Sequence, residues 1–264
     1  MTPQLLQLIG IGDWPAFVLI SARVAGFFFA VPLWSTVGLP KSVRSAAAVL
    51  LSVILIPAVT PVAPIPDDMV AMAVILAGET LMGIAIGMTG AMFLHGITVA
   101  GEVASLQMGL SLGQAIGAVP EGATVGVGQL KGYFASLIYL SLGGHLTLYS
   151  ALAASFTAVP PGKAVLGIDG ARMVAELAGT VFSSGIRAAA PIMVALLLAN
   201  VALAILGKAV PQLNVMMMAF PVTISLGLIA LGASLPFLAA YIGGQVDALP
   251  ALLGRTISAF QPAQ

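Results

Sequence analysis

The feature of this sequence that most constrains its fold is a series of long apolar segments separated by short breaks rich in proline and glycine. A helix needs about 20 apolar residues to cross the hydrocarbon core of a membrane, and it satisfies every backbone hydrogen bond within one segment. We therefore predict an all-α, polytopic, membrane-associated protein with about six long helices arranged in hairpins. The apolar segments are residues 14–33, 45–59, 69–108, 130–156, 191–206 and 222–240.

The composition agrees with a membrane environment. Hydrophobic residues make up 60% of the 264 residues and charged residues 7%, whereas a soluble domain carries about 25% charged residues. The formal net charge is zero, which gives no support to nucleic-acid binding. Cysteine is absent, which excludes disulfides, thiolate metal sites and cysteine nucleophiles. The first apolar segment has no basic region before it and no convincing cleavage site, so we expect a retained helix and not a signal peptide.

The segment from Met69 to Met108 is too long for an ordinary membrane span. At about 1.5 Å per residue, a helix of this length reaches roughly 60 Å, about twice the thickness of the hydrocarbon core. Either the helix breaks near Gly96–Gly101, or it does not lie in the bilayer as an ordinary span. The next segment, Gly109–Gly128, is too weakly apolar for a span and too poor in charge for a solvated loop.

The last break, GKAVPQLNVMMMAFPVTI over residues 207–224, is more structured than a simple turn requires. Its two prolines each remove a backbone donor and disfavour helical geometry in the preceding residue. Its amide side chains offer donors and acceptors, and its methionines form a deformable apolar surface. A soft-metal site at these methionines would lack supporting histidine or cysteine ligands. We therefore predict a contact surface formed by Lys208, Pro211, Gln212, Asn214, Met216, Met217, Met218, Phe220 and Pro221.

Five ionisable or polar residues lie inside the apolar segments: Arg23, Glu79, Glu102, Arg187 and Asn200. A charge in such a position costs on the order of 2.5–3.5 kcal/mol on insertion scales. One interpretation makes these residues a proton or solute pathway. We favour the other, in which they pair with one another or with neighbouring subunits and fix the register of the helices, because no acidic pair converges in the sequence.

Three glycines, Gly83, Gly87 and Gly90, lie close to one face of the predicted third helix. Small residues in this pattern let membrane helices approach closely. The same pattern also arises by chance in chains rich in glycine and alanine, so both interpretations remain open.

The sequence carries no enzymatic signature. The zinc motif HExxH, the nucleophile elbow GxSxG and the phosphate loop GxxxxGK[ST] are all absent. His95 and His145 stand isolated in apolar surroundings, where a packed or hydrogen-bonded histidine is more common than a ligand. We expect a protein that is not an enzyme and that needs no cofactor or metal.

The last break continues as GKAVPQLNVMMMAFPVTISLG, and three further segments occur with it: SARVAGFFFAVPLWSTVGLPKSVRSAAAV, GETLMGIAIGMTGAMFLHGITVAGEVASLQMGLSLGQAIGAVP and APIMVALLLANVALAILGKAVPQLN. Together, and in this order, these segments resemble the FliR family, the R subunits of flagellar and related type III protein-export gates. The resemblance covers most of the chain. The sequence departs from the family's pattern at Val119, Asn200, Lys208 and Thr223, which puts a charge-pairing role at those positions in doubt.

The resemblance implies a place in an assembly. Such R subunits join P and Q subunits in a helical, pore-forming gate, much of which stands above the bilayer. Residues 1–170 would correspond to a P-like part, and residues 171–264 to a Q-like hairpin with its tip at 207–221. Residues 108–123 match the position of a plug that closes the pore until an unfolded substrate passes. The candidate plug residues are Met108, Gly109, Leu110, Ser111, Gln114 and Gly117.

The resemblance also implies partners and a location. The hairpin tip would meet Q subunits and the B-type subunit that switches export substrates, and exported unfolded proteins would pass through the pore. The gate would lie in the bacterial inner membrane, at the centre of the flagellar basal body. Transport energy would come from other components, namely the proton-motive force and the export ATPase.

Two alternatives remain open at the level of sequence. A secondary transporter for a small solute would use Arg23, Glu79 and Arg187 at a midplane site, but it predicts an internal repeat that we do not find. An equivalent subunit of a virulence type III secretion system would share the same subunit plan as the flagellar gate.

Overall fold

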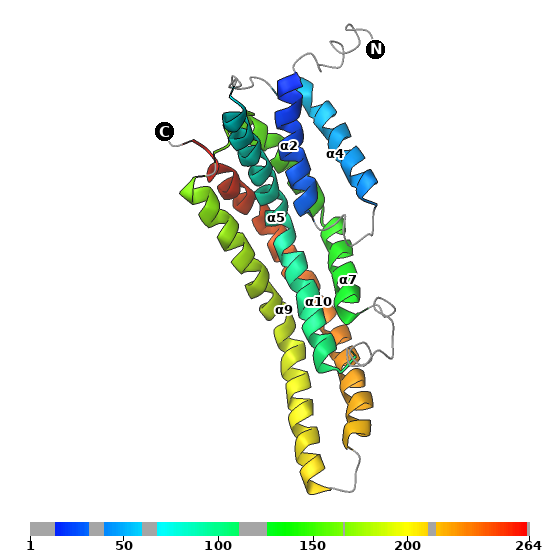
Figure 1. The fold of residues 1–264 in the computed structure, drawn as a ribbon. Coiled ribbons are helices and arrows are strands. Elements are labelled where there is room, and N and C mark those ends of the chain that lie inside the picture. The colour runs from blue at the N-terminus through cyan, green and yellow to red at the C-terminus, as the bar shows by residue number, and fades with distance from the viewer. Residues whose placement is uncertain are drawn as a thin grey trace. The chain divides into compact units, whose positions relative to one another are not determined.

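The computed structural model describes residues 14–31, 40–59, 68–110, 126–165, 167–210 and 215–262. Within these ranges every regular element is a helix, which confirms the predicted all-α class (Figure 1). In chain order the elements are α2 (Trp14–Ala30), α4 (Lys41–Leu55), the 3-10 helix η1 (Ile56–Ala58), α5 (Met69–Gln107), α7 (Val127–Ser141), α8 (Gly144–Ala158), α9 (Ile168–Ala209) and α10 (Val215–Ser258).

Several of these helices have the length and composition of membrane spans. In the described part of the chain, four segments qualify: Lys41–Ala58, Met69–Gly90, Ile168–Ala209 and Pro221–Ser258. Helices α7 and α8 add a fifth if they count as one broken span. Helix α2 is equally apolar but has only 17 residues. The chain is therefore a membrane protein, as its apolar segments predict.

Three helices are about twice as long as the hydrocarbon core is thick. They are α5 with 39 residues, α9 with 42 and α10 with 44. Of the two alternatives for this segment, the break near Gly96–Gly101 does not occur, because α5 is continuous from Met69 to Gln107. Gly96 serves helix packing instead: a Cβ at this position would lie 2.8 Å from the backbone nitrogen of Gly185.

The helix expected over residues 130–156 is in fact two helices. The chain turns at Leu142–Gly143, between α7 and α8. Gly143 adopts φ +74°, a left-handed conformation that glycine reaches without steric cost. The expectation was wrong because a glycine in an apolar segment is equally compatible with a continuous membrane helix.

The break expected over residues 207–224 is shorter in the structure. Helix α9 continues to Ala209, and α10 already begins at Val215. Pro221 consequently lies inside the second turn of α10. Pro221 is the seventh residue of α10, so its missing N–H leaves the carbonyl four residues earlier without its helical donor.

By its internal contacts the chain divides into two compact units. Unit 1 comprises Met1–Met92, Leu142–Gly179 and Val246–Gln264, and unit 2 comprises Phe93–Ser141 and Thr180–Gln245. The division at residue 170 into a P-like part and a Q-like hairpin concerns likeness to other subunits, and it remains a prediction.

In unit 1, α2 packs against α5 through glycines on both helices. A Cβ at Gly83 of α5 would collide with the carbonyl oxygen of Arg23, and a Cβ at Gly26 of α2 would collide with that of Thr80. One turn further along α5, a Cβ at Gly87 would lie 2.8 Å from the carbonyl oxygen of Phe27. The glycines on this face therefore allow the two backbones to touch, as small residues do between membrane helices.

Unit 2 has its own apolar core, formed where α5, α9 and α10 meet. A second contact in this unit joins α5 to α7, where the rings of Phe93 and Tyr139 pack edge to face with centroids 5.6 Å apart. Helices α5 and α7 also approach closely at Gly132, where a Cβ would lie 2.8 Å from the hydroxyl of Thr98.

Candidate functional site

Helix α5 ends where the candidate plug segment begins. Gly109 adopts φ +77°, its N–H donates to the carbonyl of Leu106 at 3.1 Å, and the N–H of Leu110 donates to the carbonyl of Ser105 at 3.1 Å. These two bonds form a Schellman motif with glycine in the left-handed position. Of the candidate plug residues, Met108, Gly109 and Leu110 are described, whereas Ser111, Gln114 and Gly117 lie outside the described residues.

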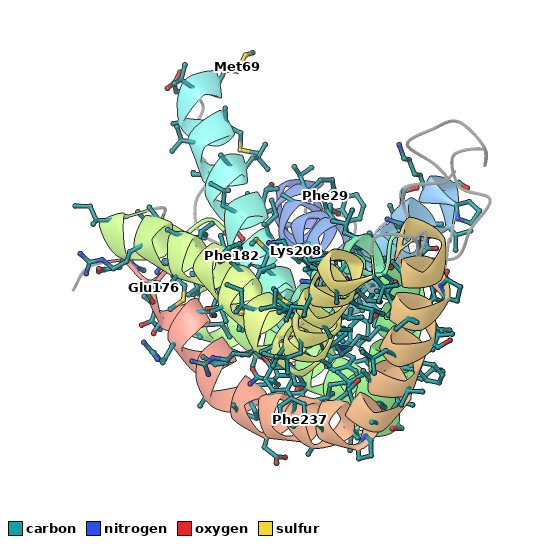
Figure 2. All side chains as sticks on the ribbon, turned by 90° about the horizontal axis from the view of Figure 1, so that it is seen from below. Phe29, Met69, Glu176, Phe182, Lys208 and Phe237 are labelled. Carbon is teal, nitrogen blue, oxygen red and sulfur yellow. The ribbon has the colours of Figure 1, made fainter. Side chains whose placement is uncertain are left out.

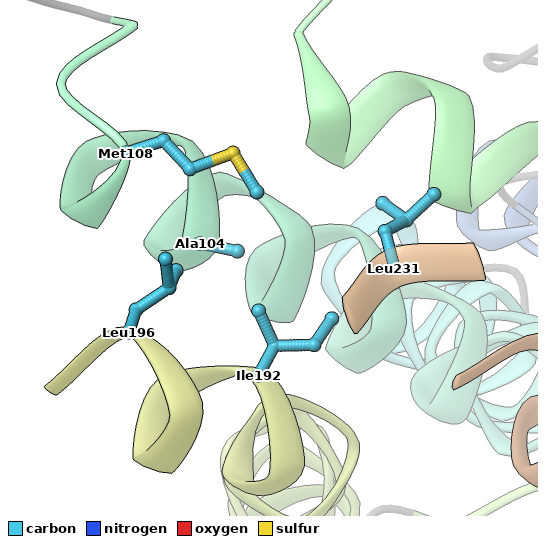
Figure 3. Packing of buried hydrophobic residues seen from close by; sticks show 5 residues of the cluster. All are labelled: Ala104, Met108, Ile192, Leu196 and Leu231. Carbon is cyan, nitrogen blue, oxygen red and sulfur yellow. The ribbon is translucent and has the colours of Figure 1, made fainter. Parts of the chain in front are cut away.

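The side chain of Met108 is fully buried in the core of unit 2 (Figure 3). It also fills the space beside Gly227 of α10, because a Cβ at this glycine would lie 2.7 Å from both Cγ and Sδ of Met108 and closer still to Cε. No side chain can occupy position 227 while Met108 stays in place. The remaining members of the core cluster are Ala104, Ile192, Leu196 and Leu231.

The backbone of Met108 is bound to α10 as well. Its carbonyl lies at the end of α5, where carbonyls lack an N–H donor within the helix. The hydroxyl of Thr223 donates to this carbonyl at 3.2 Å and shares its proton with the carbonyl of Ala219 at 2.9 Å. Thr223 and Gly227 are one helical turn apart on α10, so both face the end of α5.

The candidate contact surface at the last break is described only in part. Lys208 lies exposed in the last turn of α9, and Pro221 lies exposed in α10. Pro211, Gln212 and Asn214 lie outside the described residues. Met216, Met217, Met218 and Phe220 belong to the first turns of α10, but their side chains lie outside the described part. The contact surface therefore remains a prediction.

The structure brings two of the five embedded polar residues together. Arg23 of α2 and Glu79 of α5 form an ion pair of 2.7 Å, and both side chains are fully buried. The guanidinium also donates to the carbonyl of Ser155 and to that of Val159, both at 3.0 Å. The ring of Phe156 covers the guanidinium, with 4.4 Å between its centroid and the Arg23 Cζ.

The second oxygen of Glu79 is also occupied. It accepts the backbone N–H of Gly162 at 2.8 Å, and Gly162 adopts φ +89°. The ion pair thus ties together α2, α5, the end of α8 and the turn that follows. Because the charges satisfy one another within this one chain, the geometry is that of a structural bond and not of an open ion path.

The other three embedded residues are not brought together. Glu102, Arg187 and Asn200 are each exposed in the chain as described. A residue on such a surface is available to another molecule, so their proposed pairing with neighbouring subunits stays a prediction.

One buried charge was missed by the reasoning from sequence. Lys131 of α7 has 1% of its side chain exposed, and its ammonium donates to the carbonyl of Ala188 in α9 at 3.0 Å. Three residues later α9 contains Pro191, which has no N–H to donate and distorts the helix near the carbonyls before it. Lys131 therefore donates next to the carbonyl of Arg187, which the missing N–H of Pro191 leaves without its helical donor. The available signal was a single lysine in the apolar stretch after Gly126.

Among the described residues there is no group of three or more potential metal ligands. His95 lies exposed on α5, and His145 lies half-buried near the start of α8. The two histidines are on different helices and belong to different units.

Similarity to known proteins extends over most of the chain. The profile of the family described as Bacterial export proteins, family 1, matches residues 14–249. The flagellar biosynthetic protein FliR of Caulobacter vibrioides is 29% identical over 218 residues, which cover 82% of this chain and 87% of the relative. The protein of the same name from Escherichia coli is 26% identical over 238 residues, 90% and 89% of the two chains. That from Aquifex aeolicus is 30% identical over 221 residues, 82% and 83% of the two chains.

Proposed function

This chain belongs to the family of bacterial export proteins that includes FliR, and on that premise we propose that it is a non-catalytic subunit of the flagellar type III protein-export gate. It assembles with P and Q subunits, contributing residues 1–170 as a P-like part and residues 171–264 as a Q-like hairpin. The tip of this hairpin meets the Q subunits and the B-type switch subunit. Unfolded flagellar proteins pass through the resulting pore in the inner membrane, at the flagellar basal body.

The observation that carries this proposal, beside the family match over residues 14–249, is the excess length of the apolar helices. Helices α9 and α10 have 42 and 44 residues, about twice what the hydrocarbon core can cover. Apolar side chains nevertheless face outward along them; Figure 2 labels Phe182 and Phe237, which are 71% and 53% exposed. An apolar surface that the bilayer cannot cover needs other protein chains, which supports a subunit of a larger assembly.

The chemistry of the buried charges supports a non-catalytic role. The Arg23–Glu79 pair is closed on itself, and the ammonium of Lys131 is bound to a backbone carbonyl. Such groups position helices and are themselves not available as an acid or base for turnover. The energy for transport then comes from the other components of the apparatus.

The closing element of the pore is the segment that follows α5. Its residues 109–122 include four glycines and two alanines, with one serine and one glutamine, a composition that suits a reversible seal which accepts any substrate sequence. The Schellman motif at Gly109 separates this segment from the helix. The three relatives described above carry flagellar names, which favours the flagellar over the virulence apparatus.

Co-expression with the P and Q subunits, followed by purification in mild detergent, tests the assembly. We expect the chain to elute in a large complex with both partners. A chain that behaves only as a solitary monomer or dimer would contradict the proposal.

Deletion of residues 109–122 tests the plug. In cells that carry the complete apparatus, we expect the deletion to make the membrane leaky to small ions, while the P and Q subunits still co-purify. An unchanged leak with the assembly intact would remove the plug assignment but leave the subunit assignment in place.

A further inference from the structure

We propose that Thr223 and Gly227 of α10 are positioning residues that hold the end of α5 in the export gate, and that Met108 is the residue they hold. The inference rests on the proposed function, because it assigns a role to the point where α5 passes into the plug segment. It concerns only described residues, all of which belong to unit 2.

The two contacts on Met108 are of different kinds, and each is specific. Thr223 holds the backbone, since its hydroxyl donates to the Met108 carbonyl at 3.2 Å across 115 positions of sequence. Gly227 holds the side chain, since the methionine occupies the volume that a Cβ at 227 would need. Both contacts act on the last residue before Gly109, where the backbone leaves the helix at φ +77°.

The position of Thr223 and Gly227 on α10 determines how a movement of this helix reaches Met108. Thr223 and Gly227 lie within the first four turns after Val215, where α10 starts. The same turns follow the tip that is proposed to meet the partner subunits. A shift or rotation of this part of α10 therefore displaces Met108 directly, because interdigitated core side chains do not slide freely past one another. Partner contacts at the tip thus set the position of the end of α5.

Two glycines of α10 make the first test specific, because Gly227 packs against Met108 and Gly232 has nothing beside it in the described chain. A Gly227→Ala substitution places a methyl group 2.7 Å from Cγ and Sδ of Met108, so the side chain of the methionine must shift. We expect the ion leak of cells carrying the complete apparatus to approach that of the variant lacking residues 109–122. Gly232→Ala is the matched control on the same helix, because a Cβ there meets nothing within 4 Å. We expect no leak from the control.

A compensating substitution separates positioning from simple misfolding. In the double variant Met108→Ala with Gly227→Ala, the shortened residue 108 leaves room for the new methyl group. We expect this double variant to leak less than Gly227→Ala alone, which is non-additivity of the kind that contacting residues show. A leak of the double variant equal to or above the sum of the single variants would overturn the contact as a positioning device.

Two conservative substitutions of Thr223 test the hydrogen bond from its hydroxyl to the Met108 carbonyl. Thr223→Val keeps the shape of the side chain but removes the donor, so we expect a leak, whereas Thr223→Ser keeps the hydroxyl and should stay tight. Equal tightness of the two variants would overturn the role of the carbonyl contact.

If residues 109–122 can be deleted without a leak, the proposed plug function itself fails. If that deletion leaks and neither Gly227→Ala nor Thr223→Val does, only the present inference fails.

The absence of cysteine from the chain allows a direct test of movement. In the variant Met108→Cys with Gly227→Cys, the new sulfur at position 108 stands near the present Cγ, 2.7 Å from the Cβ position of residue 227. Oxidation should join the two helices covalently. Because the inference has the end of α5 move together with this part of α10, we expect the oxidised gate to export flagellar protein as the reduced gate does. A block of export on oxidation that a reductant relieves would show that the end of α5 must move relative to α10, and would overturn the inference.

Discussion

Arg23 and Glu79 form an ion pair of 2.7 Å in unit 1, with neither side chain exposed at all. The two residues are 56 positions apart, so the pair joins α2 to α5 over a long loop closure. A buried ion pair is often no more stabilising than well-packed apolar side chains of similar volume. Removal of one partner is a different matter, because it leaves the other charge buried without compensation.

Replacement of Arg23 alone by methionine should therefore cost about 3–5 kcal/mol of unfolding free energy. In the double variant Arg23→Met with Glu79→Met, no charge remains buried, so most of that loss should be recovered. The thermal unfolding midpoints of the purified variants in detergent measure both effects. Arg187→Met is the control, because Arg187 is exposed and its replacement should change stability by no more than about 0.5 kcal/mol. Equal losses in the single and double variants would contradict this account.

Lys131 and Pro191 should be energetically coupled. Lys131→Met removes the donor to the Ala188 carbonyl and should cost about 1–3 kcal/mol, the usual cost of leaving a buried polar group unsatisfied. A Pro191→Ala substitution restores the N–H that the carbonyl of Arg187 lacks and removes the ring that crowds this turn, so the cost of Lys131→Met should be smaller in that background. A double-mutant cycle of unfolding free energies measures the coupling. Lys163→Met, at an exposed lysine, is the control, and a coupling energy of zero would refute the link between the Lys131 contact and Pro191.

The helices were predictable from sequence because a run of about 20 apolar residues has few other stable states in a membrane. The ends of the helices were harder to predict, because a glycine in an apolar helix can either admit a neighbouring helix or end the helix that contains it. Gly96 lies inside α5 and admits a neighbouring backbone, whereas Gly143 ends a helix with a positive φ. Nothing in the sequence around the two residues separates these uses.

The contacts of the site were predictable only as residue types. The cost of burying charge indicated that Arg23 and Glu79 need partners, but their mutual contact depends on how the helices pack. Lys131 escaped notice because its partner is a backbone carbonyl, which any residue offers. The contact between Met108 and Gly227 was also not predictable from sequence, because a glycine does not indicate which side chain packs against it.

The close approach of α2 and α5 should be intolerant of a methyl group at Gly83. The new Cβ would collide with the Arg23 carbonyl and lie 3.0 Å from the backbone nitrogen of Phe27. Because backbone atoms cannot yield as a flexible side chain does, we expect Gly83→Ala to destabilise the chain by about 1–3 kcal/mol. Gly179→Ala in α9 meets nothing within 4 Å and should gain up to about 1 kcal/mol from helix propensity. Thermal unfolding compares the two, and stabilisation by both substitutions would refute the packing.

The outward face of α9 should be covered by protein and not by lipid alone. Leu198 is 64% exposed on this helix, whereas Leu196, two positions earlier, is fully buried. If Leu198 faces a partner subunit, Leu198→Lys should greatly reduce the amount of P and Q subunits that co-purify, because a charge is placed in an apolar interface. The chain itself should keep its abundance and protease resistance in the membrane.

The control variant Leu196→Lys distinguishes loss of assembly from loss of folding. This substitution places the charge in the core cluster of unit 2, so it should lower the abundance of the chain as well as the recovery of its partners. Leu198→Lys should affect the partners alone. A variant at Leu198 that recruits the P and Q subunits as well as the unsubstituted chain does would mean that this face meets lipid. The excess length of α9 would then need another explanation than a surrounding assembly.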